Sequence, residues 1–546
     1  MVARSPEAQA IGRLRRNEEV RATSVAASGT AETAIQSART GFMFPTISRR
    51  TLAFTSLTLS SVVSGPRLGA QTSAAASRTP DFAAVDAYVA REMSADRLPG
   101  VSIAIVHGDS IVHVHGFGDD GHGRPVTAET GFLLGSMSKA FTALAIMQLV
   151  DRGAVMLDAP VKRYLPAFRV ADAKASEKIT VRQLLYHTSG IPTYAPRAHG
   201  TALTVGDHVR ALSNVELAHA PGTVHEYASP NYLVLGAIIE AVTGQTYATY
   251  VHQSVFLPLS MRGSFTDQTM ATANSMARGH RYIFGYPVAA TLPEESDRLP
   301  TAALISNAQD LAHFLIAQLG QGQYAGQRVL SPAAVELMHR GGAPADGFSY
   351  AFGWRDGTLA GVRAVHHGGI LPHFRGKMVM LPELGWGVVV LTNASSSLPL
   401  PLAPTSHRMA DGIAAYLAGQ SLPPASSRHR VTFAALTFAM IAVIVAQLRG
   451  LWRAHRRPAP AASSRRAAFW RQSVVDLAYV LLAVVGPSLL HMSWKELLQL
   501  APDVSVWLLT TVILSLATVV ARWARWFGAA ASAATVGPSL ERERPA

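Results

Sequence analysis

The chain is 546 residues long, carries a formal net charge of +13 and contains no cysteine. A chain of this length exceeds what one ordinary hydrophobic core holds, so we expect two or more structural units. The missing cysteines exclude disulfides, thiolate metal sites and a cysteine nucleophile. Hydrophobic residues make up 49% and charged residues 15% of the chain, a balance that indicates membrane segments. Many arginines lie beside apolar runs near the C-terminus, so we interpret the charge as a topology signal and expect no nucleic-acid partner.

An export signal is predicted near the N-terminus, over residues 43–72. There, SRRTLAFTSLTLSSVVSGPRLGAQ joins an arginine pair to a modest apolar stretch and a small-residue site that ends at Ala70. This pattern is typical of a twin-arginine signal, with an uncleaved anchor as the alternative. Residues 1–42 are polar and lack apolar periodicity, so we expect them to be disordered or to precede the true start, which we hypothesise to be Met43.

Residues 78–422 alternate helix-like and strand-like patterns with glycine and proline punctuation, which predicts a globular mixed domain. The run GVSIAIVHGDSIVHVHGFG, residues 100–118, reads as two β-rich segments around a turn at 107–109, a hairpin signal. The run GWGVVVLTN, residues 385–393, predicts a further buried strand.

A membrane region with three transmembrane helices is predicted within residues 430–522, followed by a tail over 523–546. The three apolar runs, each near membrane-spanning length, are 431–448, 473–490 and 504–521. The loop over 449–472 carries seven arginines, whereas the next loop has one lysine. The positive-inside rule therefore places the arginine-rich loop and the tail in the cytoplasm. We expect the globular domain on the outer face of a lipid membrane, in agreement with the export signal.

The segment GFLLGSMSKAFTALAIMQLVDRG, residues 131–153, places Ser136 and Lys139 at the start of a long apolar helix. Residues three apart share a helix face, so the lysine lies one turn from the serine hydroxyl. The helix is apolar nearly all round and is therefore expected to be buried, which favours a neutral amine able to accept the serine proton. The helix N-terminus adds a positive field for an acyl oxyanion. In isolation, the pattern also fits a serine N-cap followed by a surface lysine.

Further motifs follow this segment in order: ITVRQLLYHTSGIP (179–192), PGTVHEYASPNYLVLGAIIEAVTG (221–244) and HHGGILPHF (366–374). The ordered set resembles the serine β-lactamase and penicillin-binding-protein superfamily, above all its class C β-lactamase-like esterase and peptidase branch. The resemblance implies an α+β fold, in which an antiparallel sheet flanked by helices adjoins a helical subdomain. It also implies that Ser136 is the acylated nucleophile and that Lys139 is its activating partner.

The tyrosine of the family's Y-x-N motif falls on Tyr227, whose phenol would relay a proton to the leaving group. The usual asparagine is replaced by Ser229. A second register stays open, because Ser229 to Asn231 spell the S-x-N of other branches. We favour Tyr227, because Tyr232 then opens the following apolar helix at the spacing that the resemblance implies. His187, in YHTSG, is expected to be a hydrogen-bonding scaffold residue.

The family's K-T-G strand motif matches His367, Gly368 and Gly369. Glycines let the strand approach an acyl substrate closely, and the resemblance implies an oxyanion hole made by the amides of Ile370 and Ser136.

His366 is a rival for the histidine position, but counting back from Phe374 favours His367. The glycine that usually precedes this phenylalanine is His373 here, a bulky departure. Without the strand lysine a fixed positive charge is missing, so recognition of β-lactams or D-alanyl peptides is less secure than ester hydrolysis.

Two further histidines, His113 and His115, share one strand face at a spacing that can bind metal. No third ligand is identifiable, so we expect a structural role, no metal and no organic cofactor.

The sequence thus predicts a membrane-anchored extracytoplasmic serine hydrolase acting through an acyl-enzyme on esters, amides, β-lactams or D-alanyl cell-wall peptides. The alternative is a sensor or binding protein that is acylated with little turnover.

Overall fold

The computed structural model describes residues 79–195, 198, 203–290, 296–395, 405–461, 463–489 and 493–528. The expected export signal over 43–72 and the hypothesised start at Met43 lie outside the described residues, as do residues 1–42 and most of the expected tail. The described residues belong to the compact unit Thr79–Ala546.

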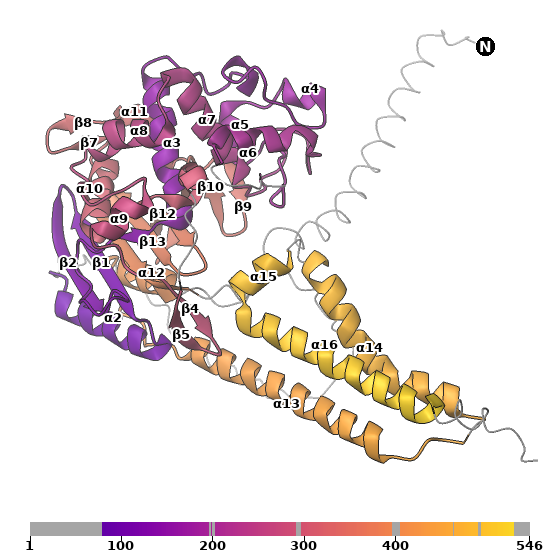
Figure 1. Ribbon diagram of the computed structural model, residues 1–546. Coiled ribbons are helices and arrows are strands. Elements are labelled where there is room, and N and C mark those ends of the chain that lie inside the picture. The colour runs from indigo at the N-terminus through magenta and orange to yellow at the C-terminus, as the bar shows by residue number, and fades with distance from the viewer. Residues whose placement is uncertain are drawn as a thin grey trace, which may run out of the picture. The chain divides into compact units, whose positions relative to one another are not determined.

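An eight-stranded antiparallel sheet forms the centre of the globular part, in the order β2-β1-β14-β13-β12-β11-β10-β9 (Figure 1). The strands are β1 (Gly100–His107), β2 (Ser110–Gly118), β9 (Ala343–Ala345), β10 (Phe348–Tyr350), β11 (Arg355–Leu359), β12 (Val362–Ile370), β13 (Arg375–Leu381) and β14 (Trp386–Thr392). The hairpin predicted at 100–118 is confirmed, because β1 pairs with β2 and His107 lies opposite Ser110. The buried strand predicted at 385–393 is β14.

Each face of the sheet has its own hydrophobic core, because successive strand residues point to opposite sides. Val101, Ile103 and Ile105 of β1 pack in the cluster that includes α2 (Phe82–Asp96) and α12 (Thr405–Leu417). Ala104 and Val106 belong to the cluster on the other face, which includes α3 (Ser138–Asp151) and α10 (Ala308–Leu319). The predicted α+β architecture, an antiparallel sheet flanked by helices, is confirmed.

A helical subdomain is inserted between β2 and β9 (Figure 1). Besides α3 and α10, it contains α4 (Ala173–Ser176), α5 (Val181–Leu185), α6 (Val205–Ala211), α7 (Pro230–Thr243), α8 (Tyr247–Val251), α9 (Gln268–Ala273) and α11 (Pro332–His339). The same stretch of chain contains the short strands β3 (Phe132–Leu133), β6 (Ile305–Ser306), β7 (Gln323–Tyr324) and β8 (Gln327–Arg328). It also contains β4 (His280–Ile283) and β5 (Tyr286–Ala289), which form a separate small sheet with β15 (Ala394–Ser395), and Tyr282 of β4 packs in the core that includes α2 and α12.

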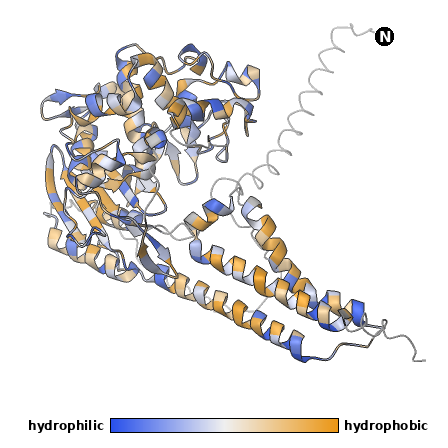
Figure 2. Cartoon of the chain, viewed as in Figure 1, coloured by the Kyte–Doolittle hydropathy of each residue, from blue (hydrophilic) through white to orange (hydrophobic). Residues whose placement is uncertain are grey.

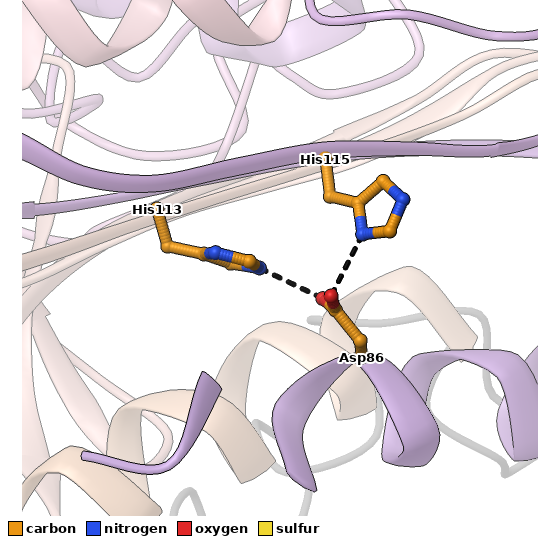
Figure 3. Close-up of side chains that lie close together, drawn as sticks. All are labelled: Asp86, His113 and His115. Carbon is orange, nitrogen blue, oxygen red and sulfur yellow. Dashed lines mark hydrogen bonds and ion pairs between the residues drawn. The ribbon is translucent and has the colours of Figure 1, made fainter. Parts of the chain in front are cut away.

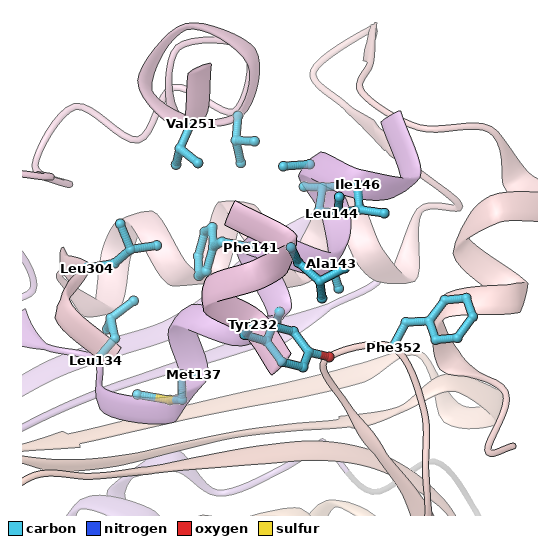
Figure 4. Packing of buried hydrophobic residues seen from close by; sticks show 14 of the residues in the cluster. Leu134, Met137, Phe141, Ala143, Leu144, Ile146, Tyr232, Val251, Leu304 and Phe352 are labelled. Carbon is cyan, nitrogen blue, oxygen red and sulfur yellow. The ribbon is translucent and has the colours of Figure 1, made fainter. Parts of the chain in front are cut away.

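Helix α3 is enclosed on every side, as the sequence predicts. Every residue from Ser138 to Leu149 is buried. Phe141 stacks on Phe314 of α10 with ring centroids 4.1 Å apart, and Figure 4 shows it among the apolar side chains around α3. Such packing fixes the start of α3, where the candidate nucleophile lies, in a rigid position.

Three helices among the described residues are long and apolar enough to cross a membrane, and they correspond to the three predicted runs (Figure 2). They are α13 (Arg428–Arg456), α14 (Arg465–Leu489) and α16 (Pro502–Trp523), with the short α15 (Trp494–Leu500) between the last two. Asp476 of α14 forms an ion pair with Arg522 of α16 at 2.6 Å. Gln447 of α13 donates hydrogen bonds to Thr511 O and Ser515 Oγ of α16. Polar contacts of this kind hold apolar helices together in lipid.

Candidate active site

Ser136 lies in a single 3₁₀ turn, Gly135–Met137, that leads directly into α3. Gly135 has a φ of +55°, and a Cβ there would lie 2.8 Å from the backbone nitrogen of Ile370. The turn therefore requires glycine for both its conformation and its contact with β12. Within residues 131–149 only Ser136 is not buried. The turn thus presents one hydroxyl at the surface of an otherwise enclosed segment.

Lys139 lies one helical turn further on, with its amine beside the serine hydroxyl. Its Nζ is 3.1 Å from Ser136 Oγ and donates to Thr301 O at 3.0 Å, while its side chain is fully buried. Burial is the largest cause that lowers the pKa of Lys139 below its usual range. The alternative of a surface lysine is therefore wrong. A neutral amine in this position can accept the Ser136 proton.

Tyr227 lies on the other side of the lysine amine, with its ring centroid 5.1 Å from Lys139 Nζ. Its hydroxyl is buried, and its interaction with the amine opposes the lowering of the Lys139 pKa by burial. The ring centroid of the neighbouring Tyr232 lies 5.8 Å from Lys139 Nζ. The hydroxyl of Tyr232 donates a hydrogen bond to Leu185 O. Of these two tyrosines, Tyr227 is the one whose hydroxyl proton is not donated to a backbone carbonyl.

Asn231 of α7 is fully buried and serves the scaffold. Its Oδ1 accepts from Ser189 Oγ at 2.6 Å, and its Nδ2 lies 3.0 Å from His187 Nδ1. Both ends of the amide are thus engaged inside the protein, whereas Ser229, the residue before α7, is half-buried and makes no capping bond. The geometry favours the Tyr227 register over the S-x-N register.

The structure confirms that His187 is a hydrogen-bonding scaffold residue. Its Nδ1 accepts from the Ala228 backbone N–H at 3.2 Å and from the Asn231 amide, so the ring proton resides on Nε2. That Nε2 is buried and has no hydrogen-bond partner among the described residues. Burial, and next the charge of Lys139, hold the pKa of His187 well below its usual range, so the ring is neutral.

Strand β12 lies directly against the Ser136 turn. A Cβ on Gly369 would come 1.9 Å from Leu134 O, whereas a Cβ on Gly368 would meet the His407 ring of α12 at 2.5 Å. The two glycines therefore face opposite sides of the sheet, and Gly369 allows the close approach. Because side chains alternate along a strand, His367 shares the Ser136 side with Gly369, and His366 faces the other side. The rival position of His366 is thereby disfavoured. The amide of Ile370 lies next to the turn, as the proposed oxyanion hole requires.

His367 is fully buried and neutral. Its Nδ1–H donates to Gly368 O at 2.8 Å, and its Nε2 accepts from the Tyr350 hydroxyl at 3.1 Å. Burial, and next the charge of Arg355, hold the pKa of His367 well below its usual range. The histidine that occupies the strand motif therefore supplies no positive charge. His373, the other departure from the motif, is buried against Gly279.

The sequence analysis does not identify two further residues near this site, Tyr350 and Arg355. Tyr350 of β10 lies opposite Arg355 of β11 in the sheet, and β11 in turn pairs with β12. The guanidinium of Arg355 lies 4.7 Å over the Phe348 ring, and its Nε has no hydrogen-bond partner among the described residues. Its charge contributes to lowering the pKa of both Lys139 and His367. No local spacing marks either residue, because strand pairing alone brings Tyr350 to His367 and Arg355 opposite His366.

A family model described as Beta-lactamase matches residues 85–407. Protein flp of Staphylococcus aureus (strain COL) is 28% identical over 452 residues, which cover 80% of this chain and 89% of the relative. Penicillin-binding protein 4 of Amycolatopsis lactamdurans is 33% identical over 310 residues, or 54% of this chain and 81% of the relative. Among solved structures, the octameric penicillin-binding protein homologue from Pyrococcus abyssi has a TM-score of 0.55 at 27% identity, covering 63% of this chain and 78% of that one.

Neutral Lys139 should control the labelling of Ser136 by a fluorophosphonate probe. The labelling rate of the wild-type chain should rise with pH and level off above the lowered pKa of Lys139, because the ammonium form cannot accept a proton. Lys139→Met and Lys139→Arg should each lower the plateau rate by about 10²-fold or more, since methionine has no basic group and the guanidinium stays charged. Lys162→Met, at a half-buried lysine that pairs with Glu177, is the matched control and should leave the profile unchanged. If Lys139→Met had the same pH profile of labelling as the wild type, Lys139 would not be the base that accepts the Ser136 proton.

Proposed function

The chain belongs to the β-lactamase family, and from that premise we propose that it is a serine hydrolase that works through an acyl-enzyme. The single observation that carries the proposal is the 3.1 Å contact between Ser136 Oγ and the buried amine of Lys139. A hydroxyl is a weak nucleophile until an adjacent base takes its proton, and a desolvated lysine is such a base. Ser136 is half-buried within an otherwise enclosed segment, and this partial exposure gives a substrate access to it.

In the proposed reaction, Lys139 takes the proton of Ser136 while Oγ forms a bond to the substrate carbonyl carbon. The carbonyl oxygen becomes an oxyanion and accepts from the backbone N–H groups of Ser136 and Ile370. The bond to the leaving group then breaks, and Tyr227 donates its hydroxyl proton to that group and recovers a proton from Lys139. Water then cleaves the acyl ester, which returns Ser136 and releases the acid.

We propose esters, amides, β-lactams and D-alanyl cell-wall peptides as the substrate classes. The last two carry a carboxylate, and His367 is neutral and buried, so the cation for this carboxylate has to come from elsewhere. We propose Arg355 for this role, because its charge contributes to lowering the pKa of both Lys139 and His367, and its partner in the β11–β12 register is His366, next to His367. A planar guanidinium is well suited to a carboxylate.

Intact-mass spectrometry of the full chain in detergent micelles tests the acyl-enzyme. We expect activated esters or penicillins to add an acyl mass to the wild type and to Ser138→Ala but not to Ser136→Ala. Ser138 is a matched control, since it is buried and its Oγ accepts from the Leu304 backbone N–H. Multiple turnovers per chain establish a hydrolase, whereas a persistent adduct without turnover would favour the acylated sensor. No adduct with any donor would overturn the nucleophilic role of Ser136.

The role of Arg355 is tested by comparing two kinds of substrate. Arg355→Gln should lower kcat/KM about 10-fold or more for a penicillin or a D-alanyl peptide, because a charged hydrogen bond to the carboxylate is lost. Hydrolysis of a neutral activated ester should stay near the wild-type rate. Arg328→Gln, an exposed arginine of β8, is the matched control. Equal losses on both kinds of substrate would assign Arg355 a purely structural role.

We further propose that α13, α14 and α16 anchor the chain in a membrane, with the catalytic domain outside and the tail in the cytoplasm. The arginines between α13 and α14 support this orientation. Because the chain lacks cysteine, single replacements report topology without background. In spheroplasts, a membrane-impermeant maleimide should label Ala425→Cys, just before α13, but not Ser463→Cys, just before α14. The opposite labelling pattern would invert the proposed topology.

A further inference from the structure

A cluster of three potential metal ligands lies at the edge of the central sheet. His113 and His115 project from the same face of the edge strand β2, and Asp86 reaches them from α2 (Figure 3). The sequence analysis found no third ligand for the two histidines and expected a structural role. Helix α2 supplies that ligand, from 27 residues earlier in the chain than His113.

The three side chains converge on one point. His113 Nε2 is 2.7 Å from Asp86 Oδ1, and His115 Nδ1 is 2.7 Å from Asp86 Oδ2. All three ligand atoms lie within 4.8 Å of one another, so small side-chain rotations would place them around one ion. The rings are held by aromatic neighbours, because Phe82 stacks on His113 with centroids 4.9 Å apart and Phe117 lies 4.3 Å from His115. Fixed ring orientations reduce the cost of ordering the ligands on binding.

We propose that Asp86, His113 and His115 form a binding site for a divalent cation of the zinc class. Two imidazoles and one carboxylate suit zinc and similar borderline metals, whereas calcium and magnesium prefer sites made of oxygen. The side chain of His115 is 48% exposed and that of Asp86 is 25% exposed. An aqueous ion can therefore enter, and water would complete its coordination.

The proposed cation site is separate from the candidate active site. Helix α2 packs in the cluster on the α12 face of the sheet, whereas α3, which begins after Ser136, packs in the cluster on the opposite face. The ion would bind α2 and β2 together without touching the reacting groups. Because it binds only the folded arrangement of these two elements, it should stabilise the native chain.

Zinc binding to the full-length chain in detergent tests the proposal, with calorimetry for affinity and elemental analysis for stoichiometry. We expect the wild type to bind one equivalent of zinc at this site and the double variant His113→Ala/His115→Ala to lose it. Asp86→Asn should bind the same zinc ion at least about 10-fold more weakly. The exposed His122→Ala is the matched control and should keep the wild-type affinity. Zinc should raise the Tm of the wild type and of the control but not that of the double variant.

Two further readouts separate the cation site from a simple ion-pair cluster. Asp86→Asn keeps a side chain that can hydrogen-bond both histidines, so a cluster without metal would predict no zinc-dependent difference from wild type. Fluorophosphonate labelling of Ser136 reports whether each variant is folded, and it should be equal in all of them. The proposal is overturned if the wild type binds no zinc, or if the double variant keeps the same affinity and number of equivalents, because the metal would then lie among the chain's other histidines.

Discussion

The burial of one amine is the constraint on which the candidate site depends. Lys139 is enclosed by the apolar start of α3, and an ammonium there would lose its water without gaining a carboxylate in exchange. The neutral form avoids most of this cost, and that form is the base the chemistry needs. The lowering of the Lys139 pKa is therefore a consequence of the same packing that makes α3 a rigid central helix. The packing around α3 therefore both stabilises the fold and favours the neutral form of the Lys139 amine, which can act as a base.

Neutrality extends to the groups around the amine. His187 and His367 are fully buried, and the positive charge of a protonated Lys139 would further disfavour protonation of either ring. His187 Nδ1 is bonded to the Ala228 backbone and to Asn231, and both ring nitrogens of His367 are bonded, to Gly368 O and to Tyr350. Both imidazoles therefore act as fixed, uncharged hydrogen-bonding groups. Such a preorganised environment is suited to stabilising charge that appears only during the reaction.

Local patterns made much of this site predictable, and long-range pairing hid the rest. Ser136 and Lys139 are three residues apart on one helix, so their contact follows from helix geometry alone, and the hairpin at 100–118 follows from a turn between two β-rich runs. Tyr350 contacts His367, and Arg355 lies opposite His366, only because β10, β11 and β12 pair side by side. Asp86 meets the histidines of β2 only because α2 folds against that edge. No spacing along the chain encodes these last contacts.

The neutral His367 in the strand motif means that a positive charge near the site has to lie at another position. A lysine at position 367 would place an ammonium close to Lys139, and a charge on either amine would oppose protonation of the other. A neutral imidazole bonded to Tyr350 avoids this repulsion and leaves the strand position filled. A nearby cation is Arg355, the first residue of β11 directly after the turn that follows Tyr350, where the side chain is only half-buried. The charge is thus displaced from the buried strand to a position where solvation makes it less costly.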